Sequence, residues 1–74
     1  MILAVYWKDK KKVQDMLDEI NKKIPLTYTE DKRTGHFEVY MDSSIVGFPV
    51  KQKNLFNEIR SNESVLIVSR REAT

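Results

Sequence analysis

The sequence predicts a small α+β protein, built as a single-layer antiparallel sheet with two helices on one face. Two stretches within Ile24–Met41 alternate apolar and polar residues, which is typical of half-buried strands because successive side chains point to opposite faces. Lys8–Lys23 carries an apolar stripe at helical spacing, as expected of a helix that covers a sheet. Ile2–Trp7 and Ser64–Arg70 are apolar on both faces, a pattern that indicates strands covered on both sides.

The first strand is expected at Ile2–Trp7, as a central strand of the sheet. Its alternation leaves open which face is buried. One face would carry Leu3, Val5 and Trp7, and the other Ile2, Ala4 and Tyr6.

The helix within Lys8–Lys23 is the clearest element. Its apolar stripe consists of Val13, Met16, Leu17, Ile20 and Ile24. Asp9 is a suitable N-cap, because a short acidic side chain can accept from the first free backbone N–H groups. Pro25 disfavours helical angles at Ile24, so we expect the helix to end near Lys23.

A hairpin follows, in which residues 30–35 connect two alternating runs. Gly35 supplies the positive φ that a longer turn needs. The expected core face consists of Leu26, Tyr28, Phe37, Val39 and Met41. The opposite face would carry Thr27, Thr29, His36, Glu38 and Tyr40.

The second half of the chain contains a segment with two interpretations. Ser43–Val50 is either a third short strand or an apolar lead into the next helix. Lys51–Asn62 then predicts a shorter helix with Asn62 as its stop. Ser64–Arg70 predicts the last strand, and residues 71–74 are expected to form a frayed tail of a single domain spanning 1–74.

The element order is therefore β-α-β-β-(β)-α-β, for which a ferredoxin-like topology is our first choice. In that topology the first and last strands lie side by side. Their outward faces would then form an apolar patch on the side of the sheet without helices, and an exposed patch on a small protein indicates an interface. The alternative is that a loop, the tail or the helices cover both faces.

Composition narrows the functional classes. The chain has no cysteine, which excludes disulfides and thiolate metal sites and fits a reducing compartment. The net charge of +2, from 13 basic and 11 acidic residues, is too small to indicate nucleic-acid binding by itself. The apolar start, residues 1–7, is too short for a signal peptide or a membrane span. We expect a complete small cytoplasmic gene product without a cofactor.

Few residues suit catalysis. His36 is the only histidine, and beside a hairpin turn we expect it at the surface. No phosphate-binding glycine loop fits Gly35 and Gly47, and no serine has an activating neighbour. A minor alternative is a ribonuclease with His36 as general base and Lys32, Arg33 or Lys51 at a phosphate. We expect no enzymatic activity and no metal site.

Basic residues gather at the two helix starts and the hairpin tip. Exposed N–H groups at a helix start, together with lysines, can bind anions, although a solvated basic face explains the same pattern. These candidates are Lys8, Lys10, Lys11, Lys12, Lys32, Arg33, Lys51 and Lys53. In a ferredoxin-like sheet the two helices start at opposite ends, which would separate the lysines into two patches.

Lys32–Tyr40 loosely resembles the third-strand signature of RNA recognition motifs. It departs from that signature at Gly35, where the family has a stacking aromatic residue, and at Glu38, where it has a core valine. Pro25–Ile59 slightly resembles double-stranded-RNA-binding domains and HicA-type toxins, but the first and last strands fit neither. We assign no family.

The first hypothesis is a non-enzymatic interaction module, acting as a regulator or inhibitor, that binds a macromolecular partner or a second copy through the apolar sheet face. Its interface candidates are Leu3, Val5, Trp7 and Tyr40, which share a face only if the odd residues of the first strand point outward. The second hypothesis is nucleic-acid binding through the basic residues. We favour a protein partner or a homo-oligomer, and expect no membrane association.

Overall fold

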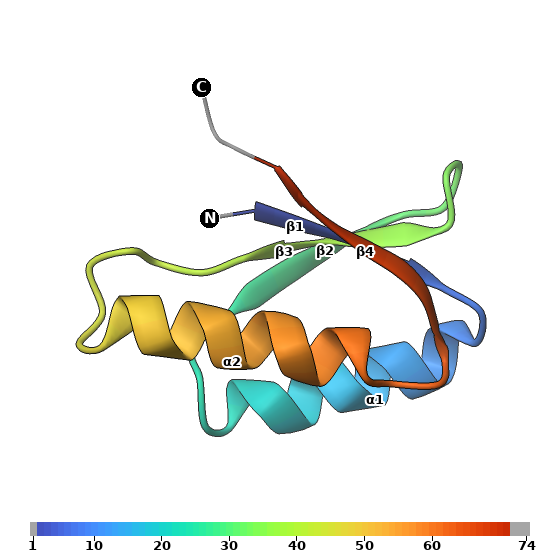
Figure 1. Cartoon of the computed structure of the whole chain (residues 1–74). Helices are drawn as coiled ribbons and strands as arrows, with labels where there is room; N and C mark the ends of the chain where they lie inside the picture. Colours follow the sequence, from blue (N-terminus) through green and yellow to red (C-terminus); the bar gives the residue numbers. More distant parts are fainter. Residues whose placement is uncertain (1, 72–74) are drawn as a thin grey trace.

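The computed structural model describes residues 2–71. Its elements follow the order β1 (Ile2–Trp7), α1 (Lys10–Asn21), β2 (Thr27–Asp31), β3 (His36–Tyr40), α2 (Phe48–Arg60) and β4 (Val65–Arg71). The four strands form one sheet in the order β2-β3-β1-β4, and every neighbouring pair is antiparallel. Both helices lie on the same face of this sheet (Figure 1). The α+β class and the two helices on one face are therefore confirmed.

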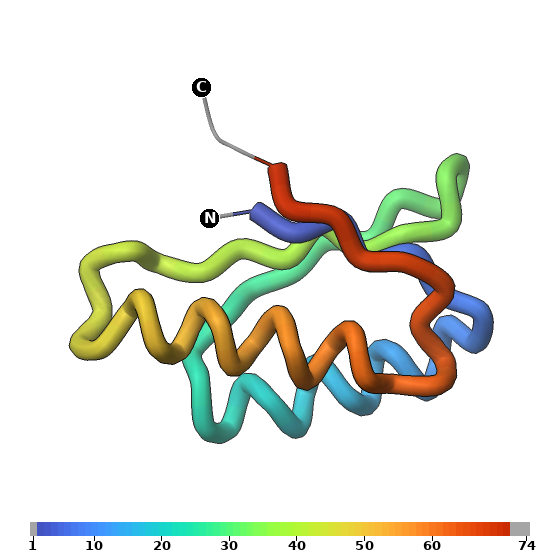
Figure 2. The backbone as a smooth tube through the Cα atoms, in the orientation of Figure 1, coloured from blue at the N-terminus to red at the C-terminus, as the bar shows by residue number. Residues whose placement is uncertain are grey.

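The helices run in opposite directions below the sheet. Figure 2 shows α1 starting at the end of the molecule that carries the β2–β3 hairpin tip, whereas α2 starts at the other end. The expected N-cap is present, because the Asp9 side chain accepts a hydrogen bond from Lys12 N. The predicted stripe supplies the buried Val13, Leu17 and Ile20, so the helical periodicity identified the face of α1 that contacts the sheet.

Ser43–Val50, for which the sequence allowed a strand or a lead into a helix, forms a turn and the beginning of α2. The optional third strand is therefore absent from this segment. Asp42 Oδ1 accepts hydrogen bonds from both the backbone N–H and the hydroxyl of Ser44. Gly47 then adopts φ +71° directly before α2, which starts with Phe48 and Pro49. The helix begins three residues earlier than predicted, because Pro49 in its first turn needs no hydrogen-bond partner there.

The hairpin forms as expected. Gly35 has φ +74° and donates its N–H to Asp31 O at 3.0 Å. The predicted core face is correct, since Phe37 and Val39 are fully buried and Leu26 and Met41 nearly so. Tyr28 packs edge-on against Phe37 at 5.2 Å between ring centroids.

The first strand is central, between β3 and β4, and its odd residues face the helices. Leu3 and Val5 are 0% exposed, and Trp7 packs against Phe37 at 4.7 Å between centroids. The even residues therefore point away from the helices. The expectation of a frayed tail is wrong for Arg71, which belongs to β4. The other tail residues, 72–74, lie outside the described part of the chain.

Candidate protein-interaction surface

The sheet face without helices, called the open face below, consists of three rows that run across all four strands. The strand register places one residue of each strand in each row. The rows are Thr27, Tyr40, Ile2 and Arg71; Thr29, Glu38, Ala4 and Ser69; and Asp31, His36, Tyr6 and Ile67. The open face is therefore mixed in character, with polar residues on β2 and β3, mostly apolar residues on β1, and Ile67 beside Ser69 and Arg71 on β4.

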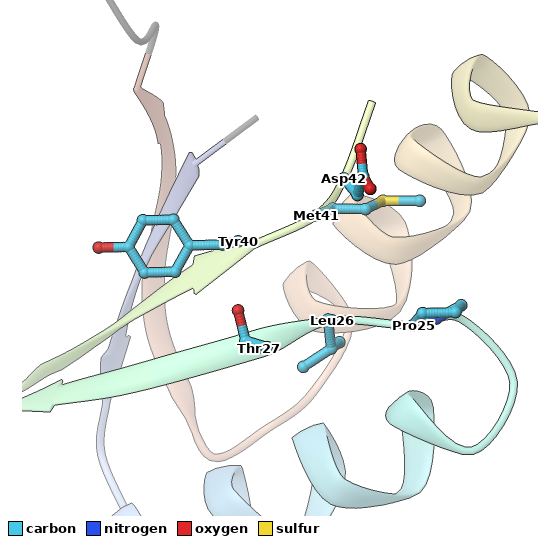
Figure 3. A pocket seen from close by; sticks show the side chains of 6 residues that line it. All are labelled: Pro25, Leu26, Thr27, Tyr40, Met41 and Asp42. Atoms are coloured by element: carbon cyan, nitrogen blue, oxygen red, sulfur yellow. The ribbon is translucent and has the colours of Figure 1, made fainter. Parts of the chain in front are cut away.

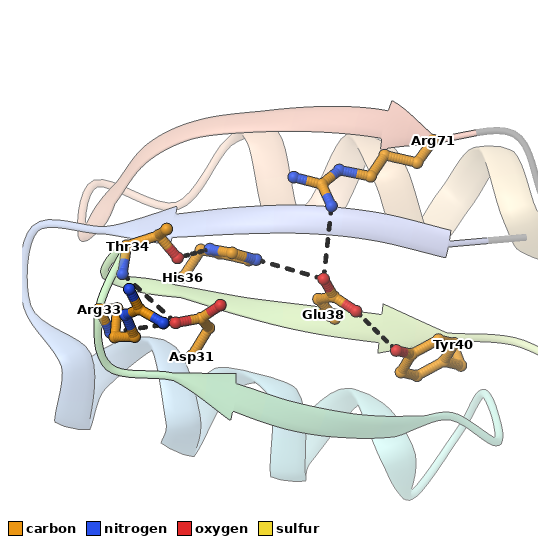
Figure 4. Close-up of polar contacts among 7 residues, drawn as sticks. All are labelled: Asp31, Arg33, Thr34, His36, Glu38, Tyr40 and Arg71. Carbon is orange, nitrogen blue, oxygen red and sulfur yellow. Dashed lines mark hydrogen bonds and ion pairs between the residues drawn. The ribbon is translucent and has the colours of Figure 1, made fainter.

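A polar network occupies the centre of this face (Figure 4). Glu38 accepts a hydrogen bond from the Tyr40 hydroxyl at 2.7 Å. Its other oxygen lies 3.4 Å from Arg71 Nη1 and 3.6 Å from His36 Nε2. The Tyr40 hydroxyl, followed by His36 and Arg71, holds the pKa of Glu38 below its usual value. The same hydrogen bond raises the pKa of Tyr40.

His36 is buried, contrary to the expectation of a surface residue. Its exposed fraction is 2%, because the Tyr6 ring lies 4.8 Å away between centroids and Thr34 Oγ1 contacts its Nδ1. Its Nε2 atom is buried and has no hydrogen-bond partner among the described residues. The sequence could not indicate this burial, which depends on a register that places Tyr6 opposite His36.

Most of the predicted interface residues lie elsewhere. Leu3, Val5 and Trp7 belong to the helix-covered core, because β1 directs its odd residues toward α1 and α2. Only Tyr40 lies on the open face, half-buried and bonded to Glu38. Within the sheet, the large apolar side chains that reach solvent are Leu66 and Ile67 on β4, with exposed fractions of 63% and 57%. Val46 and Val50, outside the sheet, are also exposed.

The two edges of the sheet differ in chemistry. The β2 edge carries Glu30 and Asp31, and Glu30 is bound by Lys10 at 2.8 Å. Charged side chains on an edge discourage the addition of another strand. The β4 edge is longer and has no charged residue from Val65 to Ser69. Its single irregularity is a bulge where Leu66 has no partner in β1. Since β4 has a neighbour on one side only, its outer backbone groups are available for pairing.

The basic candidates divide between two ends of the molecule. Lys10 links α1 to β2 through Glu30, so the first lysines lie at the end of the hairpin tip with Lys32 and Arg33 (Figure 1). Lys51 and Lys53 lie at the opposite end, near the start of α2. Intramolecular pairing partly neutralises the first group, because Lys11 binds Asp15 at 2.8 Å. The eight candidates therefore form no single groove.

A shallow hollow of about 370 Å³ lies where β2 begins and β3 ends (Figure 3). Its lining residues are Pro25, Leu26, Thr27, Tyr40, Met41 and Asp42. The carboxylate of Asp42 is bound to Ser44, and that bond lowers its pKa. No group of three or more potential metal-ligating side chains occurs anywhere in residues 2–71. Neither helix of that range has the length and hydrophobicity to cross a membrane.

Comparisons of the chain with family models, curated proteins and solved structures found no match. The candidate surface therefore depends on geometry alone. The sequence pattern placed His36, Glu38 and Tyr40 on one face of the hairpin and predicted an apolar contribution from the last strand to the face without helices, but it did not indicate Arg71. Ile67 and Arg71 join the open face through their pairing with Tyr6 and Ile2 of β1, whereas Leu66 lies at the bulge and has no partner there.

Proposed function

We propose that the protein is a small non-enzymatic interaction module, acting as a regulator or inhibitor, that binds a protein partner or a second copy of itself through β4 and the adjoining open face. The observation that carries the proposal is the exposure of Leu66 and Ile67, 63% and 57%, on an edge strand without charged residues over Val65–Ser69. Exposed apolar side chains on an unpaired edge favour association with another chain.

The chemistry of the open face supports binding over catalysis. Glu38 has its oxygens directed at Tyr40, Arg71 and His36, so the only central carboxylate is already engaged. A general base must reach its proton within hydrogen-bond distance. His36 Nε2 is buried beneath Tyr6, which disfavours the single-histidine ribonuclease.

Nucleic-acid binding is the alternative function, supported by the unpaired basic residues of the hairpin tip and of the two helix starts. Its weakness is geometric. Glu38 and Asp31 lie on the open face, so their carboxylates would repel the phosphates of a nucleic acid whose bases stacked there. The lysines lie at two separate ends of the molecule. A continuous phosphate-binding track requires basic residues along one path.

We further propose a ferredoxin-like topology and a cytoplasmic location. The first is supported by the order β-α-β-β-α-β and by β3 and β1 each lying between strands that a helix connects. The second is supported by the absence of cysteine.

Site-specific photo-cross-linking tests the proposal. A photoreactive phenylalanine analogue would replace Ile67 in one variant and Val46 in a matched control, because Val46 is 87% exposed in the loop before α2. Both variants would be expressed in the source cells. We expect one discrete adduct from position 67 and none from position 46. Equal yields, or no adduct from either position, would contradict the proposal, and the mass of the adduct distinguishes a partner from a second copy.

A further inference from the structure

We propose that β4 accepts, as an additional strand, an extended segment of a partner protein in which acidic residues alternate with apolar residues. This inference depends on the proposed function and specifies the chemistry of the partner. It follows from three features of the β4 edge: its backbone, the residues on its helix side and the residues on its open side.

The backbone of β4 is suited to strand addition beyond the bulge. From Ile67 to Arg71 the strand pairs with β1 in regular register. Its opposite side has no neighbouring strand, so alternate N–H and C=O groups point outward. An added strand would direct its side chains alternately to the helix side and to the open side.

The helix side presents two arginines on one aromatic ring. The guanidinium carbons of Arg60 and Arg70 lie 5.7 and 5.6 Å from the centroid of Phe56. Neither arginine forms an ion pair within residues 2–71, where five such pairs are present. Stacking on a ring orients a guanidinium while its N–H groups stay available for a carboxylate.

A depression of about 190 Å³ joins this cluster to the strand. Its lining consists of Arg60 and residues 65–68 of β4. A carboxylate on an added strand would enter the depression next to Arg60, with Arg70 further along the strand. The helix side therefore selects acidic residues.

The open side selects apolar residues. Ile67 is 57% exposed next to Tyr6, its partner in β1. Arg71, also on this side, is already paired with Glu38 at 3.4 Å. The two sides together define an alternating pattern, with acidic residues toward α2 and apolar residues toward Ile67.

Charge disfavours a second copy as the occupant. An antiparallel pairing of two β4 strands centred on Ile67 would place Arg70 of one copy opposite Ser64 of the other, on the side where Arg60 lines the strand. Like charges would then meet in a partly desolvated interface. Glu63 is the only carboxylate in the turn between Arg60 and β4, and it forms no ion pair within residues 2–71. An acidic partner relieves this repulsion.

The test uses a fluorescein-labelled nine-residue peptide in which Glu alternates with Val. Binding to the full chain would be followed by fluorescence anisotropy and by backbone amide NMR shifts. We expect saturable binding, with the largest shifts at residues 66–71. The same peptide N-methylated at every second residue keeps its charge but loses the N–H groups of one side, and we expect it not to bind. A peptide with Lys in place of Glu should also fail to bind.

Variants test the role of the arginines. The double substitution Arg60→Gln and Arg70→Gln should weaken binding at least about tenfold, because each lost charge-assisted contact is worth that order of affinity. The matched control is Arg33→Gln at the hairpin tip, whose structural contact is made by its backbone N–H to Asp31. This control should leave the affinity unchanged.

Three results would overturn the inference: no binding, equal binding of the Lys peptide, or binding that the double substitution leaves intact. If the peptide fails while position 67 still cross-links a partner, the proposed function stands and the acidic chemistry is wrong. If neither experiment detects association, both proposals fail.

Discussion

The orientation of β1 makes a quantitative prediction for folding stability. Leu3 is 0% exposed on the helix-covered face, so Leu3→Ala removes buried methyl groups and leaves a cavity, at a cost of about 3–5 kcal/mol. Ile67 is 57% exposed on the neighbouring strand, and Ile67→Ala should cost only about 1 kcal/mol, since roughly half of its transfer energy is realised. The two changes involve similar aliphatic side chains and differ in burial.

Urea unfolding followed by the fluorescence of Trp7, the only tryptophan, measures both values. With a urea slope of about 1 kcal/mol per molar for a chain of this size, Leu3→Ala should lower the midpoint by about 3 M or abolish the folded baseline. Ile67→Ala should lower it by about 1 M. The assigned faces would be refuted if Ile67→Ala proved the more destabilising substitution.

Three further predictions concern the open face and the hairpin. The carboxylate of Glu38 has a lowered pKa, so its contribution to stability is present above the unfolded pKa of about 4.3 and is lost as pH falls through the folded pKa. Glu38→Gln should therefore reduce the fall of the urea midpoint as the pH is lowered from 7 to 2.5. If the midpoint of the variant fell with pH as steeply as that of the wild type, the Glu38 network would be excluded. His36→Phe retains a ring against Tyr6 but removes the contacts of the imidazole with Thr34 and Glu38, so the Tm should fall by a few °C; an unchanged or higher Tm would show that those two contacts do not stabilise the fold. Gly35→Ala places a side chain at φ +74° and should cost about 1–2 kcal/mol by urea unfolding, while Gly35→Asn should cost clearly less; equal costs would argue against the left-handed turn.

Much of the fold could be predicted because the positions of apolar residues within single helices and strands identify those elements and their buried faces. The stripe of α1 included Val13, Leu17 and Ile20, all buried, and the alternation around Gly35 identified the hairpin and its core face. The pairing of the first and last strands, which the chosen topology predicted, is also present. The face of β1 could not be assigned, because Ile2, Ala4 and Tyr6 are nearly as apolar as Leu3 and Val5.

The candidate surface was less predictable because it depends on contacts between distant segments. Arg71 reaches Glu38 across β1, a separation of 33 residues. His36 is buried only because Tyr6 lies beside it. Periodicity within one element gives no information about such neighbours. The sequence predicted an apolar patch on the face without helices but not which residues of the last strand would form it; the exposure of Ile67 follows from the place of β4 at the edge of the sheet.

The most direct test of association through β4 is sedimentation velocity of the fluorescently labelled protein in an extract of its own cells. Ile67→Lys introduces a charge on the β4 edge, and Val46→Lys introduces the same charge at a loop position that is 87% exposed. We expect the wild type and Val46→Lys to sediment in a faster complex that resists nuclease, and Ile67→Lys to sediment as the free chain. A complex that Ile67→Lys retains, or that nuclease destroys, would contradict association through β4.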